Sequence, residues 1–186
     1  MTRGHPEPEA TGASREDEEE PMTLHVVTED RGVTDVEHVR WLTSDQQRCW
    51  RAYLEGTARL SEALGRQLET EAGLSLAEYE VLVRLSESDG RTMRMSVLAD
   101  SLAHSRSRVT HTVARMEKHG LVARQTCSAD GRGVNCHLTD AGFARLEAAA
   151  PGHVAQVRES LVDVLDDEQF RILGEAMAAV AAAIGH

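Results

Sequence analysis

The chain has 186 residues, enough for one domain of ordinary size and a tail, and its net charge of −11 argues against a generally adhesive nucleic-acid-binding protein. It contains no run of 18 apolar residues, so we expect no membrane span. Residues 1–38 are rich in proline, glycine and acidic groups and predict a disordered acidic tail, because they cannot bury enough surface to offset the ordering entropy. No apolar signal core follows Met1, which favours a cytoplasmic location.

A long amphipathic helix is predicted to begin at Thr43 or Ser44, with a glutamine placed for a capping box, and to end at Gly73. Its apolar positions share one broad face: Trp50, Tyr53, Leu54, Leu60, Leu64 and Leu68. The helix lacks a core of its own, so residues 39–73 are assigned to an N-terminal dimerisation helix.

The next helix is expected to open at Ser75, which forms a second capping box with Glu78. Ser96 can then cap a short helix. The apolar positions expected to face a core are Val97, Leu98 and Leu102. Ala103 and His104 fill a turn, so the pattern predicts a further helix close behind.

That further helix has two distinct faces. Ser105 can cap it, and Val109, Val113 and Met116 recur at helical spacing to bury one face. Its exposed N-terminal end carries Arg106, Ser107, Arg108, Thr110 and His111. Forked cations and short hydroxyls at such an end can bond base edges and phosphates, so the pattern predicts a helix that reads DNA.

A short ribbon follows where Gly120 ends this helix. Leu121–Thr126 and Val134–Leu138 are typical of two strands around a polar turn, and Thr139 begins another helix. Two helices followed by an arginine-bearing ribbon outline a winged helix-turn-helix. We therefore expect a mainly α fold with a small β wing, in which residues 74–140 are the DNA-binding module.

The C-terminal residues 141–186 are predicted to be dimerisation helices. One helix should run from about Asp140 to Val164 and tolerate Pro151. Asp166 and Gln169 can cap the last helix, which is rich in alanine and allows close helix approach.

Three motifs resemble the MarR family of bacterial transcriptional regulators. They are Ser105–Thr110 with the following Arg-Met-Glu-Lys-His-Gly-Leu-Val-Ala-Arg, the wing residues Asp130-Gly-Arg132, and Leu138–Gly142. The resemblance implies a homodimer with one winged module per subunit. It also implies that Arg132 lies in the minor groove and that Asp130 braces the wing.

We accordingly predict a sequence-specific regulator, most simply a repressor, that binds a palindromic operator in double-stranded DNA. Its base-reading residues would be Arg106, Ser107, Arg108 and His111, and its phosphate contacts Arg94, Ser105 and Thr110. Charge agrees with this assignment, since residues 86–140 hold eight basic against six acidic side chains. Residues 1–30 hold two basic and nine acidic side chains, so a tail that competes with DNA is an alternative to a solvated one.

The family resemblance further implies a small aromatic or anionic effector bound between the dimer helices and the winged module. Candidate ligand-binding residues are Trp50, Tyr53, Tyr79, Met95 and Arg115. Aromatic and methionine side chains at helical spacing are more often core residues, which is the competing interpretation.

Other functions remain as alternatives. A thiol-based redox sensor could use Cys49, or Cys127 and Cys136 if these face each other across the wing, and the latter two with His137 could bind a metal. A winged-helix adaptor for protein partners is a third class. No catalytic or cofactor motif is found, so we expect neither an enzyme nor a cofactor or metal.

Overall fold

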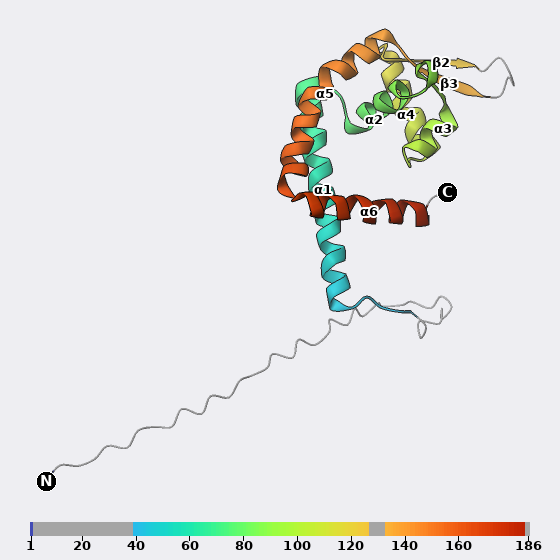
Figure 1. Ribbon diagram of the computed structural model, residues 1–186. Helices are drawn as coiled ribbons and strands as arrows, with labels where there is room; N and C mark the ends of the chain where they lie inside the picture. Colours follow the sequence, from blue (N-terminus) through green and yellow to red (C-terminus); the bar gives the residue numbers. More distant parts are fainter. Residues whose placement is uncertain (2–38, 127–132, 185–186) are drawn as a thin grey trace. The chain divides into compact units, whose positions relative to one another are not determined.

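The computed structural model describes residue 1 and residues 39–126 and 133–184. The expected disordered tail and the wing tip, with Asp130 and Arg132, lie outside the described residues. Residues from Leu42 onwards form a unit of their own. Within it the fold is mainly helical with a small antiparallel sheet, as the sequence predicts (Figure 1).

Helix α1 (Ser44–Ala72) begins and ends through local hydrogen bonds. Thr43 and Gln46 form the capping box at its start, where the Thr43 hydroxyl accepts from the Gln46 N–H at 3.2 Å. At its end Gly73 adopts a left-handed conformation, with φ of 59°. Its last turns pack against α5 (Asp140–Ser160), and the two helices lie side by side in Figure 1.

The winged module follows α1. It consists of α2 (Leu76–Ser86), the 3₁₀ turn η2 (Asp89–Arg91), β1 (Thr92–Arg94), α3 (Met95–Ser101), α4 (Arg106–Lys118), β2 (Val122–Thr126) and β3 (Val134–Leu138). The Ser75–Glu78 capping box of α2 is confirmed. Strand β1 was not expected from the sequence; it pairs with β3, which lies in the middle of the sheet.

One core unites these elements. Its fully buried side chains come from α1, α2, α3, α4, β2 and β3, and include Leu68, Leu82, Leu85, Leu98, Val113, Met116, Val122 and Leu138. The predicted buried face of α4 is therefore confirmed. Burial of this many apolar side chains supplies the main driving force for the module.

Three details differ from the sequence-based expectation. Helix α3 begins at Met95 with Arg94 as its N-cap, so Ser96 is a helical residue and not the cap. Val97 is 49% exposed because it lies on the outer face of this short helix, away from buried Leu98. Helix α5 ends at Ser160, and a 3₁₀ turn η3 (Val162–Val164) continues the chain to α6 (Asp167–Ile184).

Thr139 joins the end of the ribbon to α5. Its hydroxyl donates to the Gly120 carbonyl at 2.7 Å and accepts from the Gly142 N–H at 3.0 Å. A Cβ at Gly142 would collide with the Leu121 carbonyl oxygen and would lie 2.7 Å from Leu138 Cδ1. The Leu138–Gly142 motif is thus a packing device in which only glycine allows α5 to approach the strand so closely.

Candidate nucleic-acid interface

Helices α3 and α4 are joined by a tight turn. Ala103 adopts a left-handed conformation with φ of 51°, and the His104 N–H donates to the Ala99 carbonyl at 3.1 Å. Ser105 then caps α4 by accepting from the Arg108 N–H at 3.2 Å. The predicted turn and cap are both present, which places the first residues of α4 on the surface.

The exposed end of α4 is strongly polar. Exposed side chains there are Ser105, Arg106, Ser107, Arg108, Thr110 and His111. Among the described residues neither Arg106 nor Arg108 has an ion-pair partner, so both guanidinium groups keep their donors for an external acceptor. The Thr110 hydroxyl donates to the Arg106 carbonyl at 2.7 Å, and its proton is therefore used within the helix. Arg94, at the junction of β1 and α3, is also exposed.

Strands β2 and β3 form the ribbon that leaves the helical body beside α4 (Figure 1). Their register pairs Arg124 with Cys136 and Thr126 with Val134. The sequence-based pairing of Cys127 with Cys136 is therefore wrong, since Cys136 lies opposite Arg124 on one side and Met93 on the other. The error arose because the hairpin was centred at the wrong turn residues, and strand register depends on that choice.

Cys136 is fully buried, and burial together with the Glu117 carboxylate raises the pKa of its thiol to about 12. A redox role needs an accessible thiolate, so the environment of Cys136 opposes it. Cys127 lies outside the described residues, and Cys49 is exposed on α1. The described part of the chain contains no cluster of three metal-ligating side chains.

The base of the sheet is attached to α5 through Arg91. Its guanidinium lies 3.8 Å from the centre of the Phe143 ring and 3.3 Å from an Asp140 carboxylate oxygen. A hydrogen bond of 3.0 Å joins Thr92 Oγ1 to His137 Nδ1. His137 thus already has a partner in the sheet.

A polar pocket of about 360 Å³ lies where α1, α2, α4 and α5 meet. Arg115 lines it, and its guanidinium donates to Glu78 at 2.7 Å and to Ser75 Oγ at 3.1 Å. Burial raises the pKa of Glu78, but hydrogen bonds from the Ser75 backbone and Arg115 outweigh this, and the pKa lies below its ordinary value. His119 and Arg145 add two more nitrogen-bearing side chains to the lining.

The other four candidate ligand-binding residues do not line this pocket. Trp50 and Tyr53 stack on each other on the exposed first half of α1, with ring centroids 5.7 Å apart. Tyr79 is buried against His153, and Met95 packs on the core at the start of α3.

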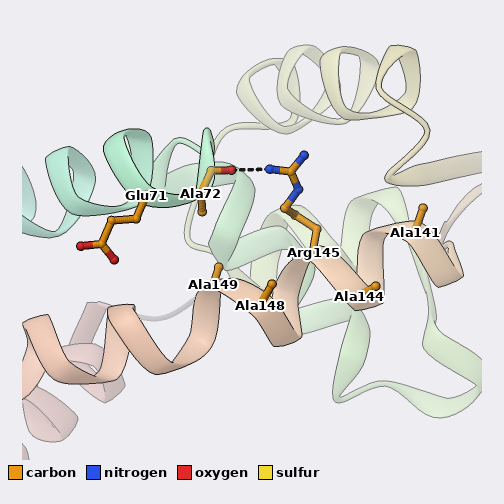
Figure 2. A pocket seen from close by; sticks show the side chains of 7 residues that line it. All are labelled: Glu71, Ala72, Ala141, Ala144, Arg145, Ala148 and Ala149. Atoms are coloured by element: carbon orange, nitrogen blue, oxygen red, sulfur yellow. Dashed lines mark hydrogen bonds between the residues drawn. The ribbon is translucent and has the colours of Figure 1, made fainter.

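A second, more open pocket of about 400 Å³ lies between the end of α1 and the first half of α5. Figure 2 shows that alanines form much of its wall and that Arg145 reaches across to α1. There Arg145 Nη1 donates to the Ala72 carbonyl at 2.6 Å, which satisfies a terminal acceptor of α1. Arg145 therefore serves first as a link between the two helices.

Taken together, the turn between α3 and α4, the exposed arginines and the antiparallel ribbon define a winged helix-turn-helix protein. The sequence model of the MarR family matches residues 72–133. The chain is 44% identical to the MarR family regulator Sco3205 of Streptomyces coelicolor, solved in complex with DNA, over 80% of this chain and 93% of that one, with a TM-score of 0.77. It is 40% identical to AbsC of the same organism, over 78% and 98% of the two chains, with a TM-score of 0.74. The chain belongs to the MarR family of transcriptional regulators.

Curated relatives are more distant. The transcriptional repressor YetL of Bacillus subtilis is 26% identical over 106 residues, and the chain spans 64% of its length. The regulator PecS of Dickeya dadantii is 28% identical over 119 residues, which are 62% of this chain and 72% of PecS. No helix within the described residues is long and apolar enough to cross a membrane.

Proposed function

We propose that this chain is a cytoplasmic DNA-binding repressor that acts as a homodimer on a palindromic operator. The observation that carries the proposal is the exposed start of α4, where Arg106 and Arg108 project without ion-pair partners among the described residues. Its similarity to Sco3205, whose structure contains DNA, supports the same conclusion.

The roles of the side chains follow from their positions. Arg106, Ser107, Arg108 and His111 would read base edges in the major groove. Arg94, Ser105 and Thr110 would contact phosphates, Thr110 through its oxygen because its proton is used within the helix. Arg132 would enter the minor groove, with Asp130 bracing the wing.

Dimer formation is supported by apolar surface that no other part of residues 39–126 and 133–184 covers. Helix α6 buries no residue, although Phe170, Ile172, Met177 and Val180 are all apolar and at least 37% exposed. The first half of α1 likewise exposes Trp50, Tyr53 and Leu54. A second copy that covers these faces would present two α4 helices to half-sites about 10 base pairs apart, or one helical turn.

Relief of repression by a small aromatic or anionic effector completes the proposal. The pocket beside Arg115 would offer an anionic ligand the guanidinium groups of Arg115 and Arg145, which line it together with the carboxylates of Glu69 and Glu78. A ligand there would contact both α1 and α4, the parts whose relative position sets the spacing of the two base-reading helices.

The test is the electrophoretic mobility of the DNA beside the protein's own gene, measured across a salt series with and without reductant. We expect a saturable, sequence-selective and salt-sensitive shift. Arg106→Ala or Arg108→Ala should weaken it by about 1–3 kcal/mol, the value of one good base contact. Arg84→Ala, which removes an equal charge from α2, is the matched control and should bind as wild type.

The alternatives predict other results. A folded dimer that selects no operator from genomic DNA would contradict the proposal and favour the protein-interaction adaptor. A shift that is lost on oxidation and kept in Cys49→Ser would instead favour a thiol sensor, since Cys49 is the exposed thiol among the described residues.

A further inference from the structure

Glu117 in the last turn of α4 and Arg124 in β2 form a forked contact. Oε2 of Glu117 accepts from Arg124 Nε at 2.9 Å and from Nη2 at 2.6 Å. Oε1 accepts from the backbone N–H of Arg124 at 3.0 Å. Three charge-assisted bonds to one carboxylate fix the orientation of β2 relative to α4 as well as its distance.

This pair lies where the buried part of the ribbon ends. Val122 is in the core, whereas β2 is exposed from Arg124 onwards. On β3, Cys136 opposite Arg124 is fully buried, and Val134 further out is 41% exposed. Among the described residues beyond the pair, neither strand buries a side chain in the core, so packing alone does not fix the direction of the outer ribbon.

Glu117 is an acidic residue in the helix that is proposed to bind DNA, and its negative charge is unfavourable there. A carboxylate beside a surface that binds phosphates weakens binding, because it repels the DNA backbone. Arg124 neutralises this charge, and its hydrogen bonds hold the pKa of Glu117 below the ordinary value. The carboxylate therefore stays ionised and keeps its three acceptor contacts at neutral pH.

We propose that Glu117 is a positioning residue for the wing: it sets the direction in which the ribbon leaves α4, so that the wing and the base-reading end of α4 reach one DNA site together. The inference rests on the proposed DNA binding and on the assignment of Arg132 to the minor groove. A ribbon whose direction is fixed before binding loses less conformational entropy when the wing contacts DNA after α4 has bound.

The first experiment compares operator affinity in Glu117→Gln and Glu87→Gln. Both changes remove one negative charge from the winged module, and Glu87 pairs with Arg84 away from the ribbon. Electrostatics alone would make both variants bind DNA as tightly as wild type or more tightly. If Glu117 positions the wing, only Glu117→Gln should bind DNA more weakly, by about three- to tenfold. This loss of affinity is smaller than the loss expected when a whole groove contact is removed.

Two further variants test whether the effect acts through the wing. In an Arg132→Ala background Glu117→Gln should cause no additional loss, because the contact that it positions is already absent. Arg124→Lys keeps the positive charge but loses the fork, and it should weaken binding in the same way as Glu117→Gln. An equal loss from Glu117→Gln with and without Arg132 would overturn the inference.

A readout without DNA uses the buried Cys136 thiol, which lies opposite Arg124. In a Cys49→Ser, Cys127→Ser background, iodoacetamide should label Cys136 at least about threefold faster when Arg124→Lys is added, since local opening of the ribbon becomes easier. Arg124→Lys is used here because it keeps the Glu117 carboxylate, whose charge itself raises the pKa of the Cys136 thiol. Thermal unfolding confirms that each variant is folded. If wild type binds its operator but Glu117→Gln leaves the affinity unchanged and Arg124→Lys leaves the labelling rate unchanged, the inference alone fails. If wild type selects no DNA, the proposed function fails, and the inference with it.

Discussion

The Arg115 guanidinium of α4 lies 2.7 Å from the Glu78 carboxylate in the first turn of α2. Glu78 is only 6% exposed, and it also accepts from the Ser75 N–H at 2.9 Å. One buried carboxylate therefore caps α2 and holds the C-terminal half of α4. The link is stabilising because a buried anion without a cation would be costly.

Arg115→Ala should lower the free energy of unfolding by about 1–3 kcal/mol at pH 7, because it leaves the Glu78 carboxylate under-bonded. The pKa of Glu78 in the folded state lies below the ordinary value of 4.5. The stabilisation is therefore complete above pH 4.5 and is lost as pH falls through the folded-state pKa. Urea unfolding between pH 7 and pH 3 should show the difference from wild type shrinking. Arg84→Ala removes an exposed ion pair in which Arg84 Nη1 lies 3.8 Å from Glu87 Oε2. It should lower the free energy of unfolding by less than about 0.5 kcal/mol.

His153 of α5 predicts a second pH dependence. Its ring lies 4.3 Å from that of Tyr79, and its Nδ1 is buried with no hydrogen-bond partner in the described part of the chain. Burial lowers the pKa of His153 below 6.5, and the Glu80 charge opposes this shift only in part. Unfolded chains therefore take up the proton first as pH falls, and stability decreases below pH 6.5.

His153→Phe keeps an aromatic ring against Tyr79 and removes this titration. Urea unfolding at pH 7.5 and 5.5 should show a smaller loss of stability for the variant than for wild type. Equal losses in the two proteins would mean that His153 is protonated as easily in the folded state as in the unfolded one.

Gly142→Ala should destabilise the protein by about 1–3 kcal/mol, because the added methyl group meets the Leu121 carbonyl and the Leu138 side chain. The matched control is Gly65→Ala in α1, where no described atom beyond the adjacent helix backbone lies within 4 Å of the new Cβ. That change should be neutral or should stabilise by up to about 1 kcal/mol, since alanine is the better helix former. Chemical denaturation gives the free energy of unfolding of both variants. A Gly142→Ala protein as stable as wild type would show that α5 can move away from the strand at little cost in free energy.

Phe170→Glu should convert the proposed homodimer into a monomer, because it places a charge on the apolar face of α6. Light scattering after size-exclusion chromatography gives the mass of each species. Glu175→Gln, on the same helix, should leave the mass unchanged. A wild-type protein of 20.4 kDa in solution would contradict the dimer and, with it, the palindromic operator.

Helix boundaries were predictable where a cap is made by neighbours in sequence. Thr43 with Gln46, Ser75 with Glu78, and Asp166 with Gln169 each exchange hydrogen bonds over three residues, so the residue types alone indicate them. The start of the short helix α3 was predicted two residues late, with Ser96 instead of Arg94 as the N-cap, because this start depends on strand β1. That strand has three residues and no pattern of its own, and its partner β3 lies more than 40 residues away.

By itself, the sequence determined the helices, the two-faced α4 and the arginines at its exposed end, because these depend on spacing and capping within a few residues. Only the tertiary structure decided which distant groups meet: Arg115 with Glu78, Arg124 with Glu117, and Cys136 with the core rather than with Cys127. Contacts of this kind depend on strand register and helix packing. Both are determined by the sum of many weak interactions across the whole fold. None of these three contacts could be predicted from a local pattern in the chain.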